Sequence, residues 1–414
     1  MNNIYPNQQV TQPVYKNDCL HAIFQAVQAG RCVRVLGPRF RTKSAHMLAA
    51  AQMLQEHGGH NVYYLSLKEL PYLRQESFLV KLSSDLLLLS EADLYAGLYG
   101  RLQRELFPMD TPVPADFMQT GREFCEAMET MVQRQDRPFV LFLDNLNTAP
   151  PNVVLSLLNT LADLYTAVSQ NSGPQFQAVI GGALDLQSTS STTPTRFLQL
   201  SDLVWIHDLD EMEREAFGLA ACQRAEVIPD PHALDALFQQ TGGDLFLIER
   251  ILGLCLKQLK RRGQQTLTAP RLAEAIDTFL NNPTNDKVDE ILQQVEGDTN
   301  LLYCTLSMLE HGSLPIGQMP IKLSSFPNAL DLCGIFKRHG ESYRLKNNIW
   351  GKLLQKHLNP AQVGGFYAVN GRWRHAFEYL GKALNDGQTD VRPSLYTAVL
   401  NAMHGSENTI GAFS

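Results

Sequence analysis

The sequence predicts an α/β fold, with a parallel β-sheet core in the first half of the chain followed by a mostly helical region. Two observations predict it. Short apolar runs recur with helical patterns between them, at residues 32–36, 62–67, 139–143, 177–180 and 203–206. Buried strands that alternate with helices are typical of a parallel sheet covered on both faces. Beyond Asp208, apolar residues recur mainly at helical spacing.

The bulk composition limits the classes of partner. The chain has 414 residues, of which 44% are hydrophobic, so it is long enough for two or three domains. Its net charge is −7, and its pI is about 5.9. A local basic cluster (Lys257, Lys260, Arg261 and Arg262) fits a helix end, where cations complement the helix dipole. We therefore expect neither nucleic acid nor a membrane as a partner.

Cysteine usage and the N-terminus predict a cytoplasmic protein. The seven cysteines are scattered and show no Cys-x-x-Cys or Cys/His metal spacing, which indicates free thiols in a reducing compartment. The N-terminus has no apolar stretch typical of a signal peptide. We also find no uninterrupted apolar run of about 18 residues, the length needed to cross a bilayer.

The elements of the first half follow from their local sequences. Residues 1–16 are polar and rich in Gln, Asn and Pro, which predicts an extended arm. A short helix is predicted over 18–29, ending at Gly30. The strand at 32–36 leads into a helix over 44–56, for which the glycines that follow it form a suitable C-terminal cap.

The second half reads as a helical region followed by a compact unit. Asp230 and Pro231 are an N-cap and a first helical residue, and they start the first of three predicted helices, over 230–240, 244–262 and 270–280. A boundary is predicted at 281–283. The next pattern is a helix over 300–311, a turn at Gly312 and a short second helix over 327–333. A two-stranded hairpin follows, with strands at 334–338 and 342–345. This order of elements is typical of a winged helix.

The last segment, residues 371–384, has the small and aromatic spacing of a tetratricopeptide-type helix. One copy of such a repeat does not form a stable stack, which suggests the front of a longer parent protein.

One loop carries the strongest chemical signal. It reads Gly37-Pro38-Arg39-Phe40-Arg41-Thr42-Lys43-Ser44 and has the spacing of a phosphate-binding P-loop, with Thr42 where the second glycine belongs. In such a loop, backbone N–H groups hold the phosphates, the lysine supplies positive charge and the serine can bind Mg²⁺. A β-branched threonine resists the positive φ that glycine permits, so we expect Thr42 to weaken the fit.

A second element is the apolar run 139–143 followed by Asp144. In this context it reads as a Walker-B strand, whose carboxylate holds Mg²⁺. Asn145 occupies the position of the usual catalytic acid, and an amide can orient water but cannot accept its proton. We therefore expect slow hydrolysis or none. Asp185 and Asp208 are interpreted as cap or loop residues.

The basic residues inside the loop leave two interpretations open. Arg39 and Arg41 could contact phosphates through two hydrogen bonds each, or they could be surface residues that pair with acids elsewhere. His46, on the helix that follows, is interpreted as a packing or surface residue.

Residues 15–252 resemble the bacterial AAA-like domains of the STAND class of signalling ATPases, and residues 296–358 resemble the winged helix that typically follows. The matching blocks occur in the family's order. They are the loop at 33–44, the Walker-B strand at 139–145, the sensor-strand region at 180–182 with 193–194 and 205–209, the lid motif at 241–246 and a winged-helix block at 345–350. In the lid motif, Leu245 stands where the family places a proline.

The resemblance implies a P-loop NTPase core, a helical lid, a winged helix and a C-terminal helical segment. The expected boundaries are 1–16 for the arm, 17–208 for the core, 209–282 for the lid, 283–358 for the winged helix and 359–414 for the helical segment. It also implies a switch that binds ATP or ADP with Mg²⁺ at residues 37–44, with Ser44 and Asp144 on the metal, and that oligomerises or engages a protein partner.

Three alternatives remain at this point. The leading one is a nucleotide-controlled signalling switch that is at most a weak ATPase. The second is a scaffold or interaction module on the same fold that has lost nucleotide binding, since Thr42, Asn145 and Leu245 all fall at nucleotide-handling positions. The third is a DNA-associated AAA+ protein, for which Lys337, Arg338 and Arg344 are the only cations in the predicted wing.

Overall fold

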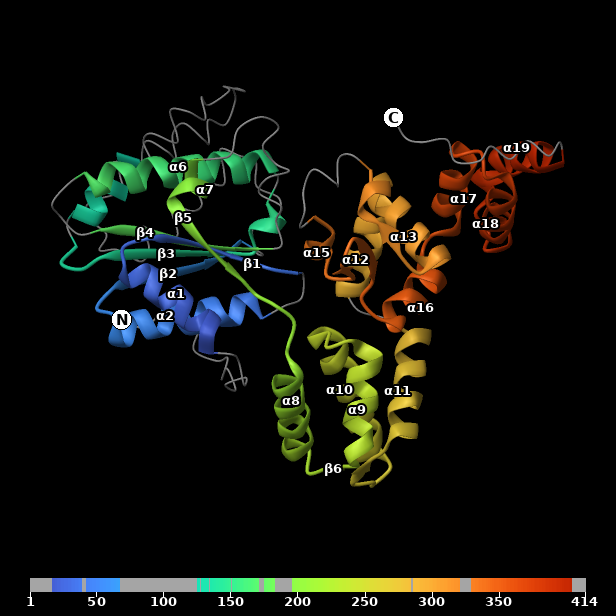
Figure 1. Ribbon diagram of the computed structural model, residues 1–414, viewed down its shortest axis with the longest axis horizontal. Coiled ribbons are helices and arrows are strands. Elements are labelled where there is room, and N and C mark those ends of the chain that lie inside the picture. The colour runs from blue at the N-terminus through green and yellow to red at the C-terminus, as the bar shows by residue number, and fades with distance from the viewer. Residues whose placement is uncertain are drawn as a thin grey trace, which may run out of the picture. The chain divides into compact units, whose positions relative to one another are not determined.

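The computed structural model divides the chain into two compact units, Met1–His207 and Asp208–Ser414. Figure 1 shows their helices and strands. The predicted α/β fold with a parallel sheet core is confirmed. The predicted arm at 1–16 lies outside the described residues. The structure describes residues 17–38, 42–67, 125–126, 128–133, 135–149, 151–170, 175–182, 196–283, 286–320 and 329–403.

The first unit is built on a five-stranded sheet in the order β2-β3-β4-β1-β5. Every neighbouring pair in this sheet is parallel. Each of the five predicted apolar runs forms one of these strands, with bounds that differ by at most two residues. The strands are β1 (Cys32–Leu36), β2 (Asn61–Ser66), β3 (Phe139–Asp144), β4 (Phe176–Gly182) and β5 (Ser201–Trp205).

Helices cover both faces of this sheet. Figure 1 shows α1 (Asn17–Gln28) and α2 (Lys43–His57) on one face, and α6 (Pro151–Ser169) and α7 (Arg196–Leu200) on the other. Alternate side chains of a strand point to opposite faces. Strand β3 shows this directly, because its residues 140 and 142 pack in the core with α1 and α2, whereas 139, 141 and 143 pack in the core with α6. Complete burial explains why β3 is a continuous apolar run.

The crossovers place several strand ends at one edge of the sheet. The connection from β1 to β2 contains α2, and the connection from β3 to β4 contains α6 on the opposite face. Because the strands are parallel, Leu36, Ser66, Asp144 and Gly182 all lie at the carboxyl edge. In open α/β sheets, ligands bind outside this edge, where the direction of strand addition reverses.

The second unit begins with a group of helices that have well-formed starts. Asp210 and Glu213 form a reciprocal capping box at α8, and Asp230 accepts the His232 N–H with Pro231 as the first residue of α9, as predicted. Two short parallel strands, β6 (Ile228–Pro229) and β7 (Thr266–Leu267), join the ends of these helices. The helices are α8 (Glu211–Arg224), α9 (Pro231–Thr241), α10 (Leu245–Arg261) and α11 (Ala269–Asn281).

A helical and hairpin region follows. Strands β9 (Phe336–His339) and β10 (Ser342–Leu345) form the predicted hairpin, with Gly340 at φ 60° in its turn. The structure adds a third antiparallel strand, β8 (Leu314–Pro315), which is too short to leave a pattern in the sequence. The helices here are α12 (Asp286–Gly297), α13 (Thr299–His311), α15 (Ala329–Cys333) and α16 (Asn348–His357).

Three helices complete the second unit: α17 (Pro360–Val369), α18 (Trp373–Asn385) and α19 (Arg392–Met403). The predicted helix at 371–384 corresponds to α18. Helices α17 and α18 approach closely at Gly364, where an added Cβ would lie 2.6 Å from Leu380 Cγ. The glycine therefore permits this contact, because any side chain would push the helices apart.

Candidate functional site

The loop begins with a close approach of two backbone segments. Strand β1 ends at Leu36, whose carbonyl oxygen accepts the Ile206 N–H at 2.8 Å. A Cβ added to Gly37 would lie 2.6 Å from the Ile206 carbonyl oxygen. Glycine is therefore the residue that fits at this position, as the loop motif predicts. The next residue, Pro38, is also described, whereas Arg39, Phe40 and Arg41 lie outside the described residues.

Thr42 does not have the backbone conflict expected of it. Its φ is −74° and its ψ is 18°, a conformation open to β-branched residues. Its carbonyl oxygen accepts hydrogen bonds from the backbone N–H and from Nδ1 of buried His46, both at 2.9 Å. The Thr42 side chain forms no cap hydrogen bond to α2. The Thr42 side chain therefore does not occupy the N–H groups at the start of the helix, which are the groups that could bind an anion.

Lys43 opens α2 and is only 7% exposed. Its Nζ donates to the carbonyl oxygens of Gly37 at 3.0 Å and Pro38 at 2.5 Å. These bonds hold the ammonium group against the start of the loop, where a bound phosphate would meet it. These two bonds orient the ammonium group.

The carboxylate of Asp144 is held on both of its oxygens. Asp144 ends β3 and is 2% exposed. Its Oδ2 accepts the Tyr64 hydroxyl at 2.8 Å, and its Oδ1 accepts the Asn145 N–H at 2.7 Å. Burial, with the neighbouring carboxylate as a smaller cause, raises the pKa of Tyr64 far above its usual range. Tyr64 therefore acts as a hydrogen-bond donor to Asp144.

The same tyrosine links the two motifs. The Tyr64 hydroxyl also lies 3.4 Å from the carbonyl oxygen of Ser44, in the first turn of α2. The structure thus brings the P-loop helix and Asp144 together around one side chain on β2. Sequence reasoning did not find Tyr64, because nothing in a strand sequence shows which neighbour its side chain contacts.

Asn145 lies in the left-handed region, with φ 61° and ψ 37°. Asn is one of the few residues that adopt this conformation readily. Its Nδ2 donates to the Ser66 hydroxyl at 3.0 Å, across the carboxyl ends of β3 and β2. The residue at the usual catalytic-acid position is therefore turned toward β2 and occupied in a structural contact.

The oxygen groups here suit magnesium. A carboxylate and a hydroxyl are hard ligands, and Mg²⁺ in proteins usually takes one or two such groups together with substrate phosphates and water. Asp144 and the exposed Ser44 offer such groups, and their role as metal ligands stays a prediction. Within the described ranges, no group of three His, Cys, Asp or Glu side chains could hold a metal by itself. The other carboxylate considered, Asp185, lies outside those ranges.

A second polar cluster lies inside the second unit. The Lys346 side chain is 2% exposed, and its Nζ contacts Asp208 Oδ1 at 2.7 Å and Asp244 Oδ2 at 3.5 Å. Asp244 also accepts the Trp350 indole N–H at 3.2 Å and caps α10 through the Leu247 N–H. The sequence predicts a cap or loop residue at Asp208, and Asp208 lies in a loop where it also forms this ion pair.

The cluster joins two sequence blocks that were noted separately, 241–246 and 345–350. Asn347 Nδ2 donates to the Thr241 carbonyl oxygen at 2.7 Å, and an added Cβ on Gly242 would lie 2.9 Å from the Lys346 carbonyl oxygen. The Phe246 and Trp350 rings stack at 6.1 Å. These contacts fix the start of α10 to the start of α16.

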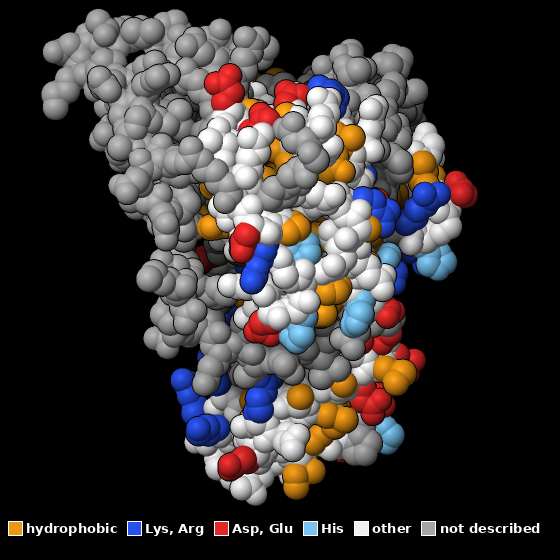
Figure 2. Space-filling view, turned by 90° about the vertical axis from the view of Figure 1, so that its left-hand side faces the viewer, with side chains coloured by type: hydrophobic (Ala, Val, Ile, Leu, Met, Phe, Trp, Pro, Cys, Tyr) orange, Lys and Arg blue, Asp and Glu red, His pale blue; other side chains and the backbone are white. Residues whose placement is uncertain are grey.

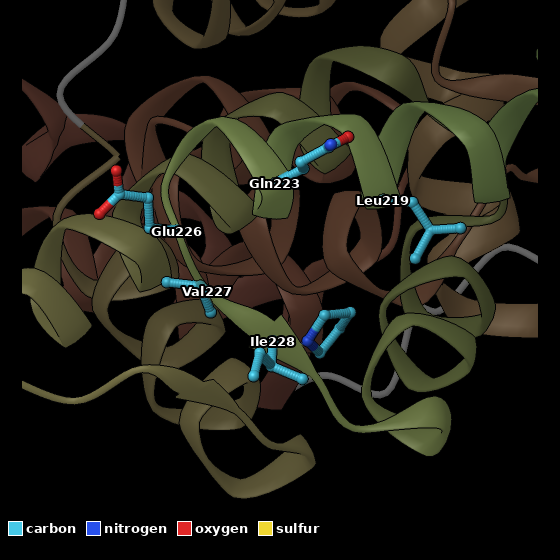
Figure 3. A pocket seen from close by; sticks show the side chains of 6 residues that line it. Leu219, Gln223, Glu226, Val227 and Ile228 are labelled. Atoms are coloured by element: carbon cyan, nitrogen blue, oxygen red, sulfur yellow. The ribbon is translucent and has the colours of Figure 1, made fainter.

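A shallow hollow of about 460 Å³ lies between α8 and β6 (Figure 3). It is lined by Leu219, Gln223, Glu226, Val227, Ile228 and Pro229. The lining offers mainly apolar contact and one carboxylate, which does not form a pair of groups suited to acid–base catalysis.

Surface charge and hydropathy bear on the other expected partners. On the face shown in Figure 2, basic, acidic and apolar side chains are interspersed. Lys337, Arg338 and Arg344 lie exposed on the β9–β10 hairpin, and the expectation against nucleic acid stays a prediction. Among the helices of the described residues, none is long and apolar enough to cross a membrane.

Comparison with known proteins adds likenesses of fold only. No protein-family model matches the chain, and no curated protein matches it. The structure is similar to the RuvB Holliday junction branch migration motor of Thermotoga maritima, with 12% identity and a TM-score of 0.42, covering 81% of this chain and 93% of that one. A Walker-type ATPase of Pyrococcus abyssi has 13% identity and a TM-score of 0.46, with 83% and 96% covered.

The ORC1 protein of Aeropyrum pernix, solved in complex with DNA, has 11% identity and a TM-score of 0.45, with 83% and 93% covered. Because these identities and TM-scores are low, the argument for a functional site in this chain rests on the residues of the chain itself. Membership of the STAND class stays a prediction.

Proposed function

We propose that the chain is a regulatory protein that binds ATP or ADP with Mg²⁺ and turns it over slowly or not at all. The observation that supports this most is the placement of three groups at one sheet edge. Lys43 is held at the start of the loop, the Thr42 side chain does not cap α2, and Asp144 is tied to the first turn of α2 through Tyr64. Together these supply positive charge, N–H donors and a metal carboxylate.

Nucleotide control of a domain arrangement belongs to the same proposal. We assign residues 17–208 to the core, 209–282 to the lid, 283–358 to the winged helix and 359–414 to a helical partner-binding region. The buried contacts of Lys346 favour a lid and winged helix that move as one body. A ligand changes such an equilibrium only by binding one arrangement more tightly than the other. Oligomerisation or capture of a protein partner would be the output.

The structure also supports slow turnover. The Asn145 amide cannot accept a proton, and its Nδ2 already donates to Ser66. A rapid ATPase would need another carboxylate to act as the base. We therefore expect multiple-turnover hydrolysis far below ordinary ATPase rates of about 1–100 per second, measured as phosphate release.

The test is a titration of fluorescently labelled ATP and ADP, with Mg²⁺, against the wild type, Lys43→Ala and the control Lys257→Ala. Lys257 is an exposed residue of α10 in the second unit, so its removal subtracts one positive charge that does not belong to the loop. We expect the wild type and the control to bind alike, and Lys43→Ala to lose affinity. Absence of binding to the wild type at millimolar nucleotide would favour the scaffold that has lost its ligand.

A further inference from the structure

We infer that Tyr64 is a positioning residue of the metal–nucleotide site, which fixes the Asp144 carboxylate against the first turn of α2. The inference rests on the proposed function, because it concerns how the same site would hold Mg²⁺. The residue lies outside the P-loop and Walker-B motifs that the sequence displays.

The position of Tyr64 follows from the sheet. Strand β2 pairs with β3 in parallel, with Tyr64 opposite Phe142 and Ser66 opposite Asp144. Tyr64 packs with the core on the face of the sheet that α1 and α2 cover, and its ring stacks on Phe142 at 6.1 Å between centroids. Packing of the ring therefore fixes the direction in which the hydroxyl points.

The hydroxyl has one hydrogen and two acceptors within reach. Asp144 Oδ2 lies at 2.8 Å and the Ser44 carbonyl oxygen at 3.4 Å, so the carboxylate is the stronger partner. With the Asn145 N–H on Oδ1, the carboxylate is restrained at both oxygens. Its orientation is thus set before any ligand arrives.

This restraint matters for a metal ion. Groups that hydrogen-bond a metal-binding carboxylate fix its direction, and their loss typically weakens metal affinity 10- to 100-fold. The nucleotide itself would still meet Lys43 and the start of α2, and the only contact of the Tyr64 hydroxyl with that turn among the described residues is the long 3.4 Å one to the Ser44 carbonyl oxygen. Removal of that hydroxyl should therefore weaken the effect of Mg²⁺ and leave metal-free nucleotide binding nearly unchanged.

The matched pair of variants is Tyr64→Phe and Tyr63→Phe. Tyr63 is the next residue of β2, and its ring packs in the core on the α6 face, stacked on Phe139 at 4.7 Å. Each variant removes one hydroxyl from the same strand. Labelled ATP is titrated in excess chelator and then at increasing Mg²⁺, and thermal unfolding confirms that each variant is folded.

We expect Tyr64→Phe to need about tenfold more Mg²⁺ for half of the metal-dependent gain in affinity, with chelator affinity within about twofold of wild type. Tyr63→Phe should match the wild type both in its Mg²⁺ requirement and in its ATP affinity in chelator. An unchanged Mg²⁺ requirement in Tyr64→Phe, an equal shift in Tyr63→Phe, or a wild type that binds ATP without any effect of Mg²⁺ would overturn the inference while nucleotide binding stands. A wild type that binds no ATP under either condition would overturn the proposed function, and the inference with it.

Discussion

Two buried lysines show how differently this chain uses the same side chain. Lys43, in the first unit, donates to the carbonyl oxygens of Gly37 and Pro38, whereas Lys346, in the second, contacts the carboxylates of Asp208 and Asp244. Two carboxylates offset the ammonium charge of Lys346, and two carbonyl dipoles orient the ammonium of Lys43. The first arrangement suits a residue that meets an arriving anion, and the second suits a residue that holds helices together.

The largest effect in this comparison is expected from Lys346→Ala. It leaves the carboxylate of Asp244 buried without its cation, and breaking a buried ion pair in this way costs about 3–5 kcal/mol. Amide hydrogen exchange in α10 and α16 measures the loss locally. The control is Lys352→Ala, an exposed lysine of the same helix α16, for which protection should stay at the wild-type level. Equal protection in both variants would show that the cluster is not structural.

Gly37→Ala should have the next largest effect, in the first unit. Its Cβ would lie 2.6 Å from the Ile206 carbonyl oxygen, so backbone must shift, at about 1–3 kcal/mol. We expect a lower free energy of unfolding in urea and weaker binding of labelled ATP. Gly253→Ala in α10 is the control, because nothing lies within 4 Å of its added Cβ. A Gly37→Ala variant with wild-type stability and wild-type ATP affinity would contradict the structural role of the close approach between Gly37 and Ile206.

Asn145→Glu tests whether the acid missing from the Walker-B strand can be restored. The left-handed backbone disfavours Glu by about 1–2 kcal/mol, and the hydrogen bond to Ser66 is lost. We therefore expect a less stable protein, by urea unfolding, that still lacks rapid phosphate release. Asn145→Gly accepts the same backbone and should be less destabilised than the Glu variant. Rapid turnover by Asn145→Glu would show that the carboxylate was the one missing part.

A more accessible ion pair should give the smallest effect. Glu310 accepts two hydrogen bonds from Arg372, which hold the pKa of the Glu310 carboxyl below its usual 4.5. A carboxyl with a lowered pKa stabilises the fold above its usual pKa, and that stability is lost as the pH falls through the lowered value. With both side chains partly exposed, the contribution is about 1 kcal/mol.

Arg372→Gln should therefore be less stable than wild type at pH 7, and the gap should narrow as the pH falls below 4.5, in urea unfolding monitored from pH 7 to 3. A gap that stays constant over this range would assign the effect of Arg372 to packing on Tyr367, which its guanidinium covers at 5.1 Å, instead of to charge.

The sequence predicted the elements whose signals are local. The strands of the first unit were found because buried parallel strands are continuous apolar runs, and the start of α9 was found because Asp230 and Pro231 are a cap and a first residue. The loop motif likewise identified Gly37, and the structure supplies the close approach that explains it.

Contacts between distant segments could not be predicted in this way. Lys346 and Asp208 are 138 residues apart, and Trp350 and Asp244 are 106 apart. Tyr64 meets Asp144 only through the register of β2 against β3, which is set by packing of the whole sheet. The prediction of a strained backbone at Thr42 was wrong for a related reason. The backbone angle at that position depends on how the helix begins, and it is negative.

The most direct test of the account measures two properties of the same two variants, Lys43→Ala and Lys346→Ala. One property is the affinity for labelled ATP with Mg²⁺, and the other is the free energy of unfolding in urea. The account predicts that Lys43→Ala loses ATP affinity together with about 1–3 kcal/mol of stability, while Lys346→Ala loses about 3–5 kcal/mol of stability and keeps its ATP affinity. ATP binding by Lys43→Ala at wild-type affinity would contradict the central claim that Lys43 meets the phosphates of a bound nucleotide.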